Sequence, residues 1–247
     1  MNYPSLKDKT SRLDTGQCLA PDENPFSTNK VTGHSLNYPI GPTCVPTKVC
    51  VETCYFGRGP STWPAALAKQ SRLRNSTIAD PPATAGRIAA WARRLKLDFV
   101  RWNGGGDLFE ESVQCLNVAA ALMSDIPQWV VTRLAHHAVN IDPQPNVYVH
   151  FSVDKFSWTR LAALRPRDDL QWFWSYQCEP DERPVHPIAP VVFRDGYDPK
   201  GDSLHSDDCP LNAAEDITGV CGRCRRCFNG EAVARAKELA PSLQERI

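Results

Sequence analysis

Cysteines are the residues of this chain best suited to chemistry, and seven of the ten lie in two groups. The first, here the three-cysteine group, is Cys44, Cys50 and Cys54, spaced C-x(5)-C-x(3)-C in a loop rich in Pro and Gly. A loop can wrap three thiolates around one centre, whereas side chains on a strand alternate between faces. Three thiolates leave one coordination position open, as a catalytic zinc or an iron–sulfur cluster requires. The alternative is that these cysteines are small buried residues, since Cys packs well in cores.

The second group, here the C-terminal cysteine group, is Cys209, Cys221, Cys224 and Cys227. Its C-x(2)-C-x(2)-C run has the spacing by which ferredoxin-like loops hold iron–sulfur clusters. Four thiolates equally well complete a tetrahedral zinc site. The arginines interspersed among them favour the ionised thiolates. We therefore predict a metal here, with a structural role favoured over electron transfer.

A glycine run with an acid, Gly104, Gly105, Gly106 and Asp107, follows a predicted strand. Ligands bind at the carboxyl ends of strands in parallel α/β folds, and glycines let backbone amides approach a ligand closely. The run is therefore a candidate cofactor-binding loop, in which Asp107 would receive an amine or a hydroxyl. The alternative is a tight strand-to-helix turn with Asp107 as the helix cap.

Further polar residues lie within or at the ends of predicted strands. They are Thr132, Arg133, His150, Asp154, Tyr176 and Gln177. If the strands are parallel and adjacent, these side chains would line one substrate cavity, for which Arg133, His150 and Tyr176 are the first candidates.

Strands and helices are expected to alternate through the middle of the chain. Apolar and β-branched runs predict strands, and apolar residues at helical spacing predict helices. The expected strands are 35–40, 97–102, 129–132, 147–153 and 170–176, and the expected helices are 84–96, 110–123 and 156–164. Such alternation predicts an α/β fold with parallel strands, as a partial or complete (β/α) barrel. A doubly wound parallel sheet is the alternative.

Composition divides the chain into three parts. Residues 1–34 are polar and rich in turn-forming residues, so we expect an irregular N-terminal arm. Residues 35–200 would form the barrel-like domain that includes the three-cysteine group. Residues 201–247 would form a cysteine-rich metal-binding segment and a C-terminal helix packed on the barrel.

Charge and hydropathy limit the location and the partners. The 28 basic and 28 acidic residues cancel, so overall charge favours neither nucleic acid nor a membrane surface. The basic C-terminal region is offset by glutamates, which leaves nucleic acid open as a weaker candidate partner. The N-terminus lacks the apolar run of a signal peptide, and no segment is apolar enough to span a bilayer. We therefore expect a reducing cytoplasm, where grouped cysteines hold metal more often than they form disulfides.

The chain resembles the mycobacteriophage gene product 88 family over about residues 35–228. The resemblance lies in the three-cysteine group with Tyr55 after it, in the run VRWNGGGD at 100–107, and in Cys209-Pro210 with the C-terminal cysteines and Phe228. It implies a phage origin and the cytoplasm of a bacterial host. It implies no activity, because none is established for the family.

A looser resemblance is to the radical S-adenosylmethionine enzymes. These have a (β/α) barrel, three loop cysteines followed by an aromatic residue, and a glycine-rich strand end with an acid that holds the amino group of the cofactor. By this resemblance the three-cysteine group would hold a [4Fe–4S] cluster and the C-terminal group an auxiliary one. The cysteine gaps here are longer than the usual C-x(3)-C-x(2)-C, and Asp107 stands where that motif ends in Glu.

Two classes of function follow. In the first, the chain is an enzyme that uses an iron–sulfur cluster, favoured over zinc, with S-adenosylmethionine at the open iron. In the second, it is a non-enzymatic phage accessory protein in which metal serves folding and the surface binds a host component, such as a host protein. The open three-thiolate site favours the first class, and the unusual cysteine spacing favours the second.

Overall fold

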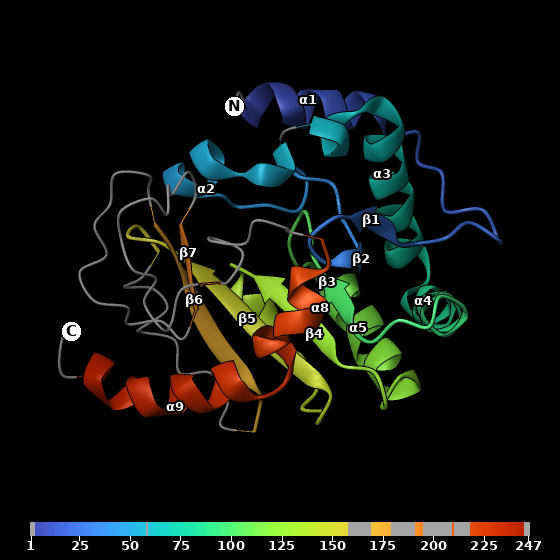
Figure 1. Ribbon diagram of the computed structural model, residues 1–247. Helices are drawn as coiled ribbons and strands as arrows, with labels where there is room; N and C mark the ends of the chain where they lie inside the picture. The colour runs from blue at the N-terminus through green and yellow to red at the C-terminus, as the bar shows by residue number, and fades with distance from the viewer. Residues whose placement is uncertain are drawn as a thin grey trace.

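The computed structural model describes residues 3–57, 59–157, 169–178, 191–194, 209 and 218–244. It shows a mixed α/β protein in which helices surround a central sheet (Figure 1). The strands are β1 Ser27–Asn29, β2 Gly33–Ser35, β3 Val100–Trp102, β4 Gln128–Thr132, β5 Val147–Val153, β6 Trp172–Cys178 and β7 Val191–Arg194. The longer helices are α1 Tyr3–Leu13, α3 Pro64–Ala79, α4 Pro81–Arg94, α5 Glu110–Leu122 and α9 Glu231–Gln244. The shorter ones are α2 Lys48–Thr53, α6 Ala135–Ala138, α8 Val220–Cys224 and the 3-10 turns η1 Tyr55–Gly57, η2 Gly59–Thr62 and η4 Arg226–Phe228.

The described strands follow one another across the sheet in the order of the sequence, from β1 to β7. Among the described strands, β1 and β2 pair antiparallel as a short hairpin, and each later neighbouring pair is parallel. The predicted α/β fold with parallel strands is therefore confirmed. The choice between a barrel and a doubly wound sheet stays a prediction.

The two faces of the sheet are covered by different parts of the chain. On β5, the alternate residues Val147, Val149, Phe151 and Val153 are buried in the main core, which also contains the apolar side of α5. On the opposite face, Trp129 packs in a second cluster with Phe99 and Phe228. The rings of Phe99 and Phe228 stack with centroids 4.2 Å apart. Phe228, from the C-terminal segment, thus covers part of the face opposite α5.

Backbone hydrogen bonds fasten the C-terminal segment to the hairpin near the N-terminus. The amide of Gly219 donates to the carbonyl of Lys30 at 2.6 Å, and the amide of Cys221 donates to the carbonyl of Val31 at 3.4 Å. In Figure 1, α8 lies in front of β3 and β4, and α9 runs beneath the sheet. The predicted packing of this segment on the sheet is consistent with these contacts, and the predicted domain boundaries stay predictions.

Helix α4 begins earlier than the sequence indicated. The expected helix began at residue 84, but the structure begins it at Pro81, so this expectation was wrong. Proline is favoured in the first turn of a helix, because the missing N–H has no intrahelical partner there. Asp80 caps the helix instead, accepting a hydrogen bond from the amide of Ala83 at 2.9 Å.

Other expected elements differ in how closely they match. The strand expected at 147–153 and the helix expected from residue 110 are confirmed. The N-terminal arm is less irregular than expected, since it contains α1 and β1. Helix α3 was not predicted from the sequence. The helix expected at 156–164 lies mostly outside the described residues.

Candidate functional site

The three-cysteine group lies on and beside the short helix α2. Cys50 is inside this helix, Cys54 is its C-terminal cap, and Cys44 precedes it. Burial raises the pKa of the Cys44 thiol, and the nearby Asp107, Cys50 and Cys54 raise it further. The three sulfurs therefore lie within electrostatic range of one another and of the acid that ends the glycine run.

The glycine run packs directly against the loop that carries the three-cysteine group. A Cβ on Gly105 would overlap the ring of Phe56, two residues after Cys54. Gly106 has φ +80°, and a Cβ there would lie 2.7 Å from the hydroxyl of Thr43. Gly104 is similarly crowded by Asn37. The glycines thus permit close approach, and in this structure the approaching groups belong to the protein itself.

Asp107 is buried and bonded at both carboxylate oxygens. One oxygen accepts from the hydroxyl of Thr132 at 2.6 Å and from the amide of Leu108 at 2.8 Å. The other accepts from the amide of Arg133 at 3.1 Å. Burial nevertheless raises the pKa of Asp107 to about 6. The helix-cap alternative was wrong, because the N-cap of α5 is Phe109.

Arg133 and His150 lie on the same side of the sheet, whereas Tyr176 does not. In the register of β5 and β6, Ser175 lies opposite Ser152 and Tyr176 lies opposite Val153. Because side chains alternate between the faces of a strand, Ser175 and Tyr176 point to opposite faces of the sheet. Val153 belongs to the main core, and Tyr176 packs against that core. The side chain beside His150 is that of Ser175.

His150 is a buried, neutral histidine with a defined tautomer. Its Nδ1 accepts from the indole N–H of Trp129 at 3.1 Å, so Nδ1 carries no proton. The proton is then on Nε2, which is hydrogen-bonded to the hydroxyl of Ser175. Burial lowers the pKa of His150 to about 3, helped by the charges of Arg101 and Arg133. Such a histidine cannot act as the base for Ser175 without rearrangement, and we interpret it as a structural residue.

The C-terminal cysteine group also converges. Burial raises the pKa of Cys227, and the nearby thiols of Cys209, Cys221 and Cys224 raise it further. The charge that opposes this effect at Cys227 comes from Arg101 on β3. Arg101 also lowers the pKa of Cys221 against the larger effect of burial. From the sequence, this electrostatic role was expected of the arginines between the cysteines, whereas Arg101 was not predicted.

Neither group is arranged as a finished metal site. Among the residues that the structure describes, no three or more His, Cys, Asp or Glu side chains have positions that could hold a metal ion. The nine cysteine side chains that it describes are thiols rather than disulfides. The thiols are gathered, but they are not at ligand positions.

Asn103 is a site residue that the sequence analysis did not single out. It has φ +54°, which is uncommon for a residue other than glycine, and it is 4% exposed. Its side-chain N–H donates to the carbonyl of Val131 at 2.8 Å, while Oδ1 has no hydrogen-bond partner among the described residues. A buried acceptor of this kind is normally satisfied by water or a ligand. The position of Asn103 between a predicted strand and the glycine run is the feature of the sequence that could have indicated it.

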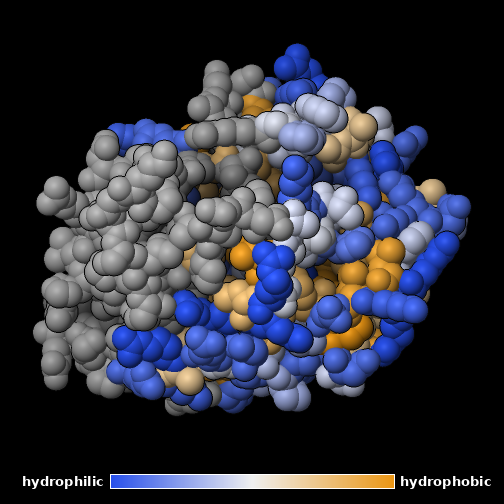
Figure 2. Space-filling model, in the orientation of Figure 1, coloured by the Kyte–Doolittle hydropathy of each residue, from blue (hydrophilic) through white to orange (hydrophobic). Residues whose placement is uncertain are grey.

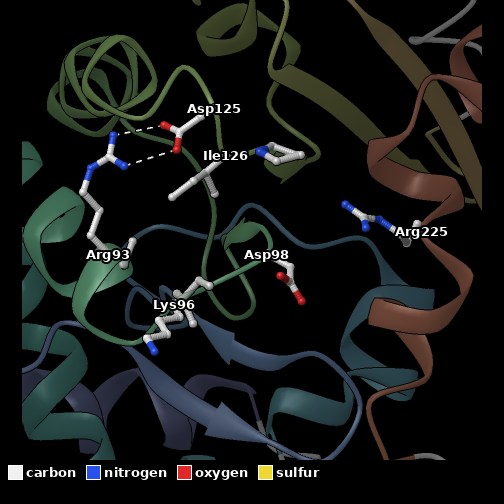
Figure 3. A pocket seen from close by; sticks show the side chains of 9 residues that line it. Arg93, Lys96, Asp98, Asp125, Ile126 and Arg225 are labelled. Carbon is white, nitrogen blue, oxygen red and sulfur yellow. Dashed lines mark hydrogen bonds and ion pairs between the residues drawn. The ribbon is translucent and has the colours of Figure 1, made fainter.

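A separate open pocket of about 580 Å³ lies at the other end of the sheet (Figure 3). It adjoins the loops that precede β3 and β4, and Arg225 approaches it from the C-terminal segment. An exposed ion pair between Arg93 and Asp125, 3.0 Å long, forms part of its wall. Figure 2 shows hydrophobic surface right of centre, bordered by hydrophilic side chains. Because ligands of parallel sheets bind at the carboxyl ends, we do not take this pocket as the site.

Comparison with known proteins gives one match. The family model described as Gene product 88 matches residues 5–230. The chain belongs to the Gene product 88 family. No curated protein and no solved structure matches it. The family resemblance seen in the sequence is confirmed, while the looser one to radical S-adenosylmethionine enzymes finds no support in these comparisons.

Membership of the Gene product 88 family supplies no activity, so function must be argued from the site. No helix among the described residues is both long enough and apolar enough to cross a membrane. The residues brought together at the carboxyl ends of the strands are the three-cysteine group, the glycine run with Asp107, and Arg133.

Proposed function

We propose that this Gene product 88 protein binds an iron–sulfur cluster through the three-cysteine group and uses it in catalysis. The observation that carries the proposal is the meeting of this group with the glycine run at the carboxyl ends of parallel strands. Phe56 packs on Gly105, and the hydroxyl of Thr43 accepts from the amide of Asp107 at 3.0 Å. The loop around Cys44 to Phe56 and the glycine run, which are far apart in sequence, thus lie in contact.

The donor set suits such a cluster. Thiolates are the usual ligands of iron–sulfur clusters, and three of them leave one iron open to another molecule. Burial raises the pKa of the Cys44 and Cys50 thiols, so cluster binding must displace their protons and would strengthen as pH rises. Since metal binding often completes its own site, gathered thiols without ligand geometry are compatible with the proposal.

We further propose S-adenosylmethionine as the molecule at the open iron and a partial barrel as the fold. The sequential strand order supports a barrel, because a doubly wound sheet reverses its order at a switch point. The bound cluster and cofactor would supply the radical chemistry. The chain's own residues would position them and exclude water. In this role Asp107 holds the turn through Thr132 and Arg133, and the peptide groups of Gly104 to Gly106 are the candidates for cofactor contact.

The C-terminal cysteine group would hold a second centre with a structural role. Cys221 and Cys227 pack beside the cluster of Phe99, Trp129 and Phe228. A metal there would fix the C-terminal segment on the sheet. This proposal does not require that centre to transfer electrons.

The test is anaerobic purification followed by iron, sulfide and zinc analysis and an absorption spectrum. We expect about four iron atoms for each cluster, with broad visible absorption that bleaches on reduction. Replacing all three cysteines of the first group by Ala should remove one cluster. The matched control is Cys18→Ala, because Cys18 is exposed and belongs to neither group. Colourless, fully folded protein without iron would refute the proposal.

Catalysis requires a second measurement. The reconstituted protein is mixed with S-adenosylmethionine and a reductant, and formation of 5′-deoxyadenosine is followed by chromatography. The product should appear with the wild-type chain and with Cys18→Ala, and it should be absent from the variant without the three-cysteine group. An intact cluster that yields no 5′-deoxyadenosine would refute the proposed reaction with S-adenosylmethionine.

A second candidate is a non-enzymatic accessory protein with structural zinc or iron–sulfur sites that binds a host component. This second candidate is favoured by the packing around Gly104, Gly105 and Gly106, because side chains of the protein itself occupy the space next to these glycines. Stoichiometric zinc, with unfolding after chelation, would support this candidate over the enzyme.

A further inference from the structure

A buried ion pair joins the carboxyl ends of three neighbouring strands. Arg133, just after β4, places Nη1 2.7 Å from Oδ2 of Asp154, just after β5. Its Nη2 donates to Oε1 of Gln177 on β6 at 2.9 Å. The two charged side chains are 11% and 0% exposed. A buried guanidinium held at two nitrogens is a fixed point in the fold.

The carboxylate of Asp154 also bonds to Thr47, the residue that caps the helix containing Cys50. The hydroxyl of Thr47 donates to Oδ2 of Asp154, and it accepts the amide of Cys50 at 3.2 Å. Thr47 is the N-cap of α2, so its side chain satisfies a backbone N–H that the helix leaves unpaired. Asp154 therefore orients the residue that starts this helix.

The second oxygen of Asp154 is also engaged. Oδ1 accepts from the amides of Phe156 at 3.0 Å and Ser157 at 3.1 Å. With both oxygens fixed, the carboxylate has one available orientation. Arg133 opposes the effect of burial on the Cys50 thiol and lowers its pKa, which places the guanidinium within electrostatic range of the group.

We infer that Asp154 is a positioning residue for the three-cysteine group, acting through Thr47 to hold the start of α2 against the ends of β4, β5 and β6. The inference deepens the proposed function, on which its metal readout rests. Asp154 and Thr47 both lie outside the two cysteine groups. Its thiol readout stands independently of any cluster.

The test uses two variants and one matched control. Thr47→Val keeps the shape of the side chain and removes the hydroxyl that joins Asp154 to the amide of Cys50. Asp154→Asn keeps one acceptor oxygen and replaces the other by a donor, which cannot accept from Thr47 or Arg133. The control, Asp125→Asn, breaks the exposed ion pair with Arg93.

The rate at which iodoacetamide alkylates each cysteine is measured by mass spectrometry on the full chain. Loss of the cap should accelerate alkylation of Cys50 by about five- to tenfold in Thr47→Val, since local opening becomes easier. The rate at Cys221 should stay unchanged, and Asp125→Asn should match the wild type at both cysteines. Iron content of the anaerobic protein should fall in Thr47→Val and Asp154→Asn alone.

Unchanged alkylation of Cys50 in Thr47→Val overturns the inference, and so does equal acceleration at Cys221, which would mean general unfolding. If Asp154→Asn fails to fold, Thr47→Val decides the result. A wild-type protein without metal refutes the proposed function, whereas the alkylation rates still decide the role of Asp154.

Discussion

The buried histidine at the centre of the sheet gives the sharpest test of the structure. His150 is 2% exposed, and its folded-state pKa is about 3, compared with an ordinary value of 6.5. Between these two values the unfolded chain binds a proton that the folded chain does not. The free energy of unfolding must therefore fall as pH falls through this window. From pH 7 to pH 5 the loss due to His150 is about 2 kcal/mol, since each unit is worth about 1.36 kcal/mol.

The assay is urea unfolding of the reduced protein at pH 7, 6 and 5, for the wild type and His150→Gln. Glutamine is uncharged, and its amide offers one acceptor and one donor in place of the two ring nitrogens. The variant starts less stable at pH 7, because the stacked ring is lost. It should then lose about 2 kcal/mol less than the wild type on going to pH 5. Parallel pH profiles for the two proteins would refute a dry, neutral His150.

Three further outcomes are expected. Asp107→Asn should remove a pH dependence of opposite sign. The folded-state pKa of Asp107, about 6, exceeds the ordinary 3.8, so wild-type stability should fall by about 3 kcal/mol as pH rises between these two values. Urea unfolding extended to pH 4 measures this difference between the wild type and the variant. Gly105→Ala should cost about 1–3 kcal/mol in urea unfolding, because its Cβ overlaps the ring of Phe56, and adding Phe56→Leu should restore part of this loss. Phe228→Ala should cost about 3–5 kcal/mol and lower the thermal midpoint, whereas Leu122→Ala, at a position 49% exposed, should change it little.

Local sequence patterns predicted the regular middle of the fold well. Alternation of apolar residues over Val147–Val153 gave the strand with the bounds that the structure shows. The same reasoning failed at Pro81, where one residue type either delays a helix or begins it. The capping Asp80 decides between these outcomes, and its hydrogen bond to Ala83 exists only once the helix has formed.

The sequence indicated the thiols and the glycine run that the structure brings together, and it did not indicate all the residues that surround them. Cysteine spacing indicated both groups, and the position after a strand indicated the glycine run. Spacing could not indicate Arg101, which lies about 120 residues before the thiols whose pKa it lowers. It also could not indicate that Ser175, rather than Tyr176, lies beside His150, because a shift of one residue in strand register exchanges the two faces.

The sequence by itself determined the elements and the chemical types: strands from periodicity, helix ends from caps, and thiols in two groups. Only the tertiary structure decided which groups meet. The hydroxyl of Thr47 reaches Asp154 across 107 positions of the chain, and the amide of Arg133 reaches Asp107 across 26. Periodicity reports a residue's neighbours within a few positions. Contacts across the sheet depend instead on strand order and register, which the whole chain fixes when its apolar faces are buried together.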